Sequence, residues 1–117
     1  MVLILGGAGA GKKEYARSLG FTDADFSTAV SDGKPVLYDL ETIVRGADVP
    51  FDALLKKKLI LCREVGSGVI PMDPKEREWR ETVGRLCCAL AKEATAVVRV
   101  VAGIPTAIKG ELPCISD

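Results

Sequence analysis

The stretch LILGGAGAGKKEYA, from Leu3 to Ala16, decides the fold. The apolar run that it completes, Met1 to Leu5, has no polar alternation, which is typical of a strand buried on both faces of a parallel sheet. A glycine-rich loop follows, and Lys12 to Leu19 has the apolar spacing of a helix and ends at Gly20, a residue type that commonly terminates helices. A strand, a glycine loop and a helix in this order form the setting that a phosphate-binding loop requires.

The loop itself matches the pattern G-x-x-x-x-G-K at Gly6, Gly11 and Lys12. Glycine lets the backbone turn sharply and approach a ligand closely, so that successive N–H groups point at an anion. A lysine at the last position reaches the β- and γ-phosphates of a nucleotide. The residues predicted to bind the phosphates are Gly6, Gly7, Ala8, Gly9, Ala10, Gly11, Lys12 and Lys13. The alternative is a glycine-rich turn that binds no ligand.

Lys13 stands where a serine or threonine hydroxyl normally contacts Mg²⁺. An ammonium group cannot ligate a cation, so we expect the Mg²⁺ site to be weak or rearranged. Asp39 ends an apolar run that begins at Pro35, and it is the best candidate to hold Mg²⁺; Glu41 and Glu64 are further candidates. The alternative for Asp39 is a carboxylate that caps the following helix.

The rest of the chain alternates between apolar strands and helical patterns. Phe21 to Lys34 has the composition of a loop or a ragged short helix. The predicted elements are a strand over 35–39, a helix over 50–58, a strand over 59–62, a helix over 73–93, a strand over 96–103 and a tail over 104–117. Such alternation predicts one domain over residues 1–117, a three-layer α/β fold of the P-loop NTPase type with a mostly parallel sheet of four strands.

The predicted helix over 73–93 has a favourable N-terminus, with Asp73 as N-cap and proline at the next position. Its inward stripe is Trp79, Val83, Leu86, Cys87 and Leu90, so Trp79 is predicted to lie in the core or a subunit interface rather than to stack on a base. Arg77 and Arg80 share a face that could meet phosphates, or else form a solvated face that pairs with Glu76, Glu78 and Glu81. A chain this short cannot easily cover both faces of a sheet, which favours a homo-oligomer.

Composition excludes several classes of function. The 16 basic and 16 acidic residues cancel, so we expect no nucleic-acid partner, and no apolar stretch is long enough for a membrane span. The apolar opening is too short for a secretory signal, which favours the cytoplasm. The four cysteines lack CxxC spacing and the chain has no histidine, so we expect reduced thiols, mostly in the core, rather than zinc or disulfides. The lack of histidine also removes every mechanism that uses imidazole.

The second half of the chain carries a resemblance. The resemblance lies in the stretch EVGSGVIPMDPKEREWRETVGRLCCALAKEATAVVRVVAGIPTAIK. This stretch resembles the bifunctional adenosylcobinamide kinase / adenosylcobinamide-phosphate guanylyltransferase family of cobalamin biosynthesis. The corresponding motifs of the family are N-E-V-G-x-G-I-V-P, R-x-F-R-D, G-R-x-N and V-x-G-[IL]-P-x-x-[IL]-K. The matching positions are Glu64, Val65, Gly66, Gly68, Pro71, Arg77, Arg80, Gly84, Arg85, Gly103, Pro105 and Lys109. The departures are Lys13 for serine, Arg63 for asparagine, Glu81 for aspartate and Cys87 for asparagine. Members of the family are longer, and one missing stretch bears their nucleotidyl-accepting histidine.

The resemblance implies ATP or GTP as the bound nucleotide and a cobinamide as the substrate. Lys12 and Asp39 would then serve phosphoryl transfer to the hydroxyl of the aminopropanol arm, and Glu64 could accept a hydrogen bond from nucleotide or substrate. Histidine-dependent guanylyl transfer would be absent. Relatives are oligomeric. The alternatives are a catalytically inactive nucleotide-binding or assembly protein derived from that family, and an interaction protein without a ligand.

Overall fold

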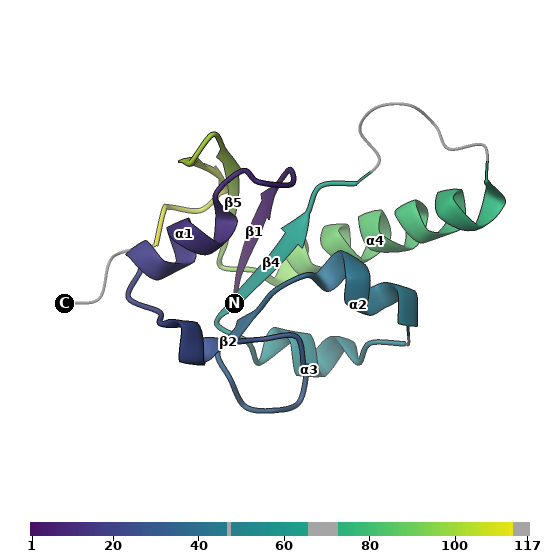
Figure 1. The fold of residues 1–117 in the computed structure, drawn as a ribbon, viewed down its shortest axis with the longest axis horizontal. Helices are drawn as coiled ribbons and strands as arrows, with labels where there is room; N and C mark the ends of the chain where they lie inside the picture. Colours follow the sequence, from purple (N-terminus) through teal and green to yellow (C-terminus); the bar gives the residue numbers. More distant parts are fainter. Residues whose placement is uncertain (47, 66–72, 114–117) are drawn as a thin grey trace.

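The computed structural model describes residues 1–46, 48–65 and 73–113, which form an α/β fold around one sheet (Figure 1). The strand order is β2-β3-β4-β1-β5-β6, and every neighbouring pair is parallel except β5 and β6. The strands are β1 (Val2–Gly6), β2 (Phe26–Ser27), β3 (Val36–Leu37), β4 (Leu59–Arg63), β5 (Ala96–Val101) and β6 (Ile104–Lys109). The mostly parallel sheet is confirmed, and within the described residues it has six strands rather than four.

Helices cover both faces of the sheet, which confirms the three layers (Figure 1). Because side chains alternate along a parallel strand that is buried on both faces, Leu3 packs on one side of β1 and Ile4 on the other. The Ile4 side is covered by α1 (Lys12–Ser18). The Leu3 side is covered by α2 (Leu40–Gly46), α3 (Phe51–Leu55) and α4 (Pro74–Glu93).

Two segments differ from the prediction. The segment predicted as a tail contains β6, which returns antiparallel to β5 through a two-residue turn at Ala102 (φ 50°) and Gly103 (φ 77°). Positive φ at both positions is the geometry that suits tight hairpins. The run predicted as a strand from Pro35 is strand only at β3, because Asp39 takes φ 55° and α2 begins at the next residue.

The remaining helical predictions are close to what is observed. The helix predicted over 50–58 is the shorter α3, and the segment over 21–34 contains a 3₁₀ turn, Asp23–Asp25, followed by β2. For α4 the prediction is confirmed: Asp73 Oδ1 accepts the Lys75 amide at 2.9 Å, and the predicted inward stripe packs against the core. Within the described residues, no helix is long and apolar enough to cross a membrane.

Trp79 joins α4 to α2. Its indole Nε1 donates to the Glu41 carbonyl at 2.7 Å, and the Arg45 guanidinium lies 3.7 Å from the centre of the ring. The same guanidinium donates to both carboxylate oxygens of Glu76 at 3.0 Å. Trp79 is therefore half-buried and packs against the core, with Arg45 over its ring, which agrees with the first of the two predicted alternatives.

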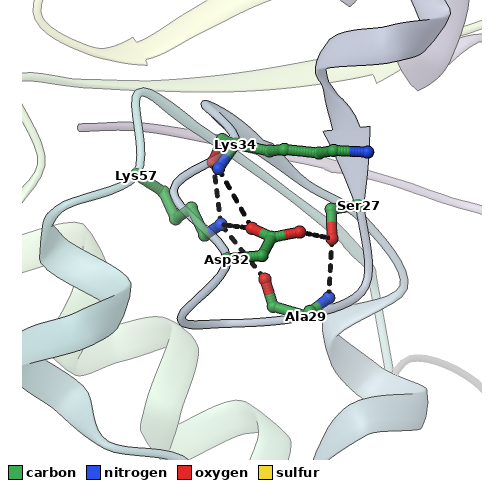
Figure 2. A network of polar contacts seen from close by, with 5 residues as sticks. All are labelled: Ser27, Ala29, Asp32, Lys34 and Lys57. Atoms are coloured by element: carbon green, nitrogen blue, oxygen red, sulfur yellow. Dashed lines mark hydrogen bonds and ion pairs between the residues drawn. The ribbon is translucent and has the colours of Figure 1, made fainter.

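A buried lysine ties the segment after β2 to the end of α3 (Figure 2). Only 3% of the Lys57 side chain is exposed, and its ammonium donates to Ala29 O (3.1 Å), Asp32 Oδ1 (3.0 Å) and Lys34 O (2.7 Å). The other oxygen of Asp32 accepts the Ser27 hydroxyl. That bond, the Lys34 amide and the Lys57 ammonium hold the pKa of Asp32 well below its usual range. All three ammonium hydrogens thus have acceptors, which is the condition for burying a charge.

Candidate phosphate-binding site

The predicted phosphate loop lies at the carboxyl end of β1, between that strand and α1. Gly9 (φ 70°) and Gly11 (φ 97°) adopt the left-handed conformation that glycine tolerates without cost. Gly6 is required for a different reason, since a Cβ there would lie 2.7 Å from the Val100 carbonyl oxygen. The loop therefore needs its glycines both for its turn and for its packing against β5.

The β5–β6 turn supports this loop from behind. The Gly103 amide donates to the Ala10 carbonyl at 2.8 Å, and a Cβ on Gly11 would lie 3.1 Å from the Gly103 Cα. The sequence analysis missed this contact because it placed the segment from Ile104 onward in a tail. The dipeptide Ala102-Gly103 at the end of an apolar strand was the available indication of a turn.

Lys12 folds back over the loop. Its Nζ donates to the Gly6 carbonyl at 3.0 Å and to the Gly7 carbonyl at 2.8 Å. Partial burial lowers the pKa of Lys12, and the nearby Glu41 carboxylate opposes that shift. The ammonium is thus held at the mouth of the loop by two carbonyl groups, which a phosphate can replace as acceptors.

An open cleft of about 390 Å³ faces the loop. Its lining comes from the loop, the start of α1, the residues after β3 and the end of β4. The lining residues are Ala8, Gly9, Ala10, Gly11, Lys12, Lys13, Glu14, Asp39, Glu41 and Arg63. The structure thus brings Asp39 next to the loop across the carboxyl edge of the sheet, where ligands bind in open α/β folds. Gly6 and Gly7 lie behind the cleft, where their carbonyls hold Lys12.

Lys13 is positioned by an aromatic ring. Its Nζ lies 4.1 Å from the centre of the Tyr38 ring, a cation–π contact that draws the ammonium toward the segment after β3. The residue that replaces the usual serine or threonine therefore lines the cleft and holds its positive charge over Tyr38. This arrangement favours an anion in the cleft and disfavours a divalent cation beside Lys13.

Three acidic residues line the cleft, Glu14, Asp39 and Glu41, and the last two have different surroundings. Glu41 is 9% exposed, and its Oε1 accepts the Arg63 amide at 3.0 Å, so it fixes the end of β4. Asp39 is exposed and lines the cleft. No group of three or more potential metal ligands occurs among the described residues. Oxygen ligands suit Mg²⁺, and Asp39 fits the role of a single carboxylate that holds the ion together with phosphate oxygens and water.

Arg63 is a cleft residue that the sequence analysis treated only as a departure from a motif. Its backbone is fixed by Glu41 and by the neighbouring Glu64 amide, which donates to the Gly6 carbonyl at 3.0 Å. With Lys12 and Lys13 it gives the cleft three cationic side chains. The indication in the sequence was a charged residue directly after the buried run Leu59 to Cys62.

The other predicted binding residues lie outside the cleft. Glu64 pairs with Arg99, whose Nε and Nη2 lie 2.7 and 3.1 Å from the two carboxylate oxygens. Arg77 and Arg80 belong to α4, and neither lines the cleft in the part of the chain that the structure describes. Their contact with phosphates, and that of Glu64 with a nucleotide or substrate, stay predictions.

Comparison with known proteins agrees with the resemblance. The chain matches the family model described as cobinamide kinase / cobinamide phosphate guanyltransferase over residues 46–108. No curated protein matches the chain. The matched region runs from the end of α2 to β6 and includes Arg63, whereas the phosphate loop precedes it. Because the match covers more than half of the 117 residues, the chain belongs to the cobinamide kinase / cobinamide phosphate guanyltransferase family.

Proposed function

We propose that this chain binds ATP or GTP through its phosphate loop and transfers the γ-phosphoryl group to a hydroxyl of a cobinamide. The observation that carries the proposal is the cleft itself. It gathers Lys12, Arg63 and Asp39 around one glycine loop at the carboxyl edge of a parallel sheet. Membership of the cobinamide kinase / cobinamide phosphate guanyltransferase family supplies the nucleotide and the acceptor as candidates.

The roles follow from charge. Lys12 would exchange the Gly6 and Gly7 carbonyls for β- and γ-phosphate oxygens, and Arg63 would contact the phosphates from the β4 side. Transfer forms a bond from the acceptor oxygen to γ-phosphorus, breaks the bond to the β–γ bridging oxygen and releases the hydroxyl proton. Asp39 would hold Mg²⁺, which neutralises phosphate charge when bound. Lys12 and Arg63 would carry part of that task.

Calorimetric titration of the full chain with ATP and with GTP, each with and without Mg²⁺, tests the proposal. We expect saturable binding of at least one triphosphate. Binding without phosphoryl transfer to a cobinamide would favour the inactive nucleotide-binding or assembly protein. The absence of heat with either nucleotide at millimolar concentration would favour an interaction protein and contradict the proposed site.

Lys13→Ser is expected to leave triphosphate affinity equal, or to raise its dependence on Mg²⁺. The substitution removes the ammonium that lies over Tyr38 and supplies the hydroxyl that Mg²⁺ sites of this kind use. The measurement is the ratio of dissociation constants with and without Mg²⁺, compared with the ratio for Lys13→Ala, which removes the charge but adds no ligand. A large loss of affinity in Lys13→Ser at every Mg²⁺ concentration would contradict this assignment.

We further propose that the chain cannot perform guanylyl transfer through a covalent intermediate. The sequence has no histidine to carry the nucleotidyl group. A lysine would need a free amine near neutral pH, and Lys12 is needed as a cation for the phosphates. After incubation with GTP labelled at the α-phosphate and denaturing electrophoresis, we expect no retained label. Label at close to one per chain would refute the claim.

Association between copies is also proposed. Large apolar side chains stay exposed on or near the β5–β6 hairpin, namely Val101 (55%), Ile104 (66%), Ile108 (59%) and Leu112 (43%). Apolar patches of this kind are typical of association surfaces. We expect light scattering at micromolar concentration to give a mass above that of the monomer, and Ile104→Asp to lower it. A monomeric mass for the unmodified chain would contradict the proposal.

A further inference from the structure

Two cysteines face each other between β4 and α4. The Sγ atoms of Cys62 and Cys87 lie 3.6 Å apart, although the residues are 25 positions apart in sequence. Cys62 is fully buried, whereas Cys87 is partly exposed. A cavity of about 220 Å³, lined also by Arg63 and Glu64, reaches Cys87. A small molecule can therefore reach Cys87, whereas Cys62 is buried.

The neighbouring thiol has a different environment. Cys88 is exposed and lines a separate surface hollow with Phe51 and Arg85, on another side of α4. Of the cysteines that the structure describes, Cys62 and Cys87 are thus the pair positioned to react with each other. A disulfide bond is about 2.05 Å long, so the sulfurs must approach by roughly 1.5 Å, which is within reach of small side-chain rotations.

The two sulfurs also differ in how readily they ionise. The hydrogen bond with Cys62 stabilises the Cys87 thiolate and lowers the pKa of Cys87. The same contact, together with burial, raises the pKa of Cys62. Because the thiolate is the nucleophile, Cys87 is the sulfur that reacts first.

We propose that Cys62 and Cys87 form a reversible disulfide with hydrogen peroxide as the oxidant. The Cys87 thiolate attacks a peroxide oxygen, the O–O bond breaks, and the leaving hydroxide is protonated to water, which leaves Cys87 as a sulfenic acid. The Cys62 sulfur then attacks the Cys87 sulfur, the S–S bond forms, and the S–O bond breaks. The departing hydroxide takes the Cys62 proton as a second water. Two thiols lose two electrons, the peroxide gains them, and a dithiol reductant reverses the step by exchange.

The site lies outside the phosphate cleft and does not depend on the proposed kinase activity. Cys62 directly precedes Arg63, the last residue of β4, which lines that cleft. The disulfide would tie this end of β4 covalently to the middle of α4. It would also close a loop through the segment that connects the two elements, and a covalent loop of that length stabilises a fold chiefly by restricting the unfolded chain.

The experiment uses the reduced full chain carrying Cys88→Ser and Cys114→Ser, exposed to hydrogen peroxide and then alkylated in denaturant. Trypsin releases Cys62 in the peptide 59–63 and Cys87 in the peptide 86–92, so the two serine substitutions leave one possible cross-link. We expect the mass to fall by two hydrogen atoms, the two peptides to appear joined, and dithiothreitol to separate them. The same chain unfolded in urea before oxidation is the matched control, and it should give markedly less of the intramolecular link.

A second variant tests the order of the steps. Cys62→Ala should lose the link and leave Cys87 as a sulfenic acid that dimedone captures, whereas Cys87→Ser should give no captured sulfenic acid at Cys62. If Cys62→Ala does not fold, the peptide map of the parent chain still shows whether Cys62 and Cys87 form the disulfide. A folded chain that keeps both thiols alkylatable after peroxide, or that joins these peptides only between molecules, would overturn the proposal.

Discussion

Replacing Lys12 by alanine is expected to lower the affinity for a nucleoside triphosphate by roughly 100-fold, since hydrogen bonds between an ammonium and phosphate oxygens are among the strong ones. In the free protein the Lys12 ammonium already lies at the loop, on the carbonyls of Gly6 and Gly7. Binding therefore exchanges one pair of acceptors for a more highly charged pair, with little change of conformation. The measurement is the dissociation constant from calorimetric titration.

Lys12→Gln serves as a companion variant, because it keeps a hydrogen-bond donor for the loop and removes the charge. Lys75→Ala, an exposed lysine on α4, is the control for the loss of one positive charge at a distance. We expect both Lys12 variants to bind weakly and Lys75→Ala to bind like the unmodified chain. Thermal unfolding shows whether the loop variants keep the fold. Equal binding by the unmodified chain and Lys12→Ala would refute the site.

Lys57→Met is expected to lower the free energy of unfolding by about 3 kcal/mol, because removing one partner of a buried polar network leaves the others unpaired. The substitution keeps the length of the apolar stem but removes a donor that serves Ala29 O, Asp32 Oδ1 and Lys34 O at once (Figure 2). Those groups would have to find water or remain without a partner. Urea unfolding followed by circular dichroism measures the change.

The chain supplies its own controls on either side of Lys57. Lys56 and Lys58 are exposed, so Lys56→Met and Lys58→Met should each change the free energy of unfolding by less than about 0.5 kcal/mol. All three variants remove one lysine charge from the same short run, so only burial separates them. If Lys57→Met proves as stable as Lys56→Met, the hydrogen bonds of Lys57 do not stabilise the fold.

Much of the fold could be predicted because several local preferences agree. The apolar run of β1, the glycines after it and the period of α1 all favour a strand, a loop and a helix in that order. In α4, Asp73 as N-cap, proline at the next position and the stripe from Trp79 to Leu90 likewise favour one long helix. Where capping, periodicity and composition all favour the same element, the sequence is sufficient to predict that element.

The predictions are wrong where a single residue or a tertiary contact determines the local structure. The run from Pro35 to Tyr38 has no charged residue, and the chain changes direction between β3 and α2 at Asp39, whose φ is 55°. The segment after Gly103 has Pro105 and alternating exposure, as edge strands often do, and no buried run marks it as a strand. The burial of Lys57 could not be predicted either, since three adjacent lysines suggest a solvated surface. Its burial depends on acceptors from another segment.

The residues of the candidate site also fall into two groups, those that the sequence predicts and those that it does not. Lys12 and the loop follow from a contiguous motif, and Asp39 follows from the rule that parallel strands bring their carboxyl ends to one edge. The place of Arg63 in the cleft and the hydrogen bond from Gly103 to Ala10 depend on which strands lie beside β1. That strand order is a property of the whole sheet. The pairing of Glu64 with Arg99 likewise joins β5 to the residue after β4. A charged residue in the apolar run of β5 was the only indication.

The central position of β1 also determines when the candidate phosphate site can assemble on a growing polypeptide. Val2 pairs with Leu59 on one side and with Ala96 on the other, and Ala10 accepts its hydrogen bond from Gly103. During translation β1 is made first, yet it has no neighbouring strand until β4 has emerged, and its second neighbour and the turn follow only with β5 and β6. Long-range pairing of this kind slows folding. A nascent chain that stops before Gly103 therefore carries the complete phosphate-loop sequence without the support that shapes it.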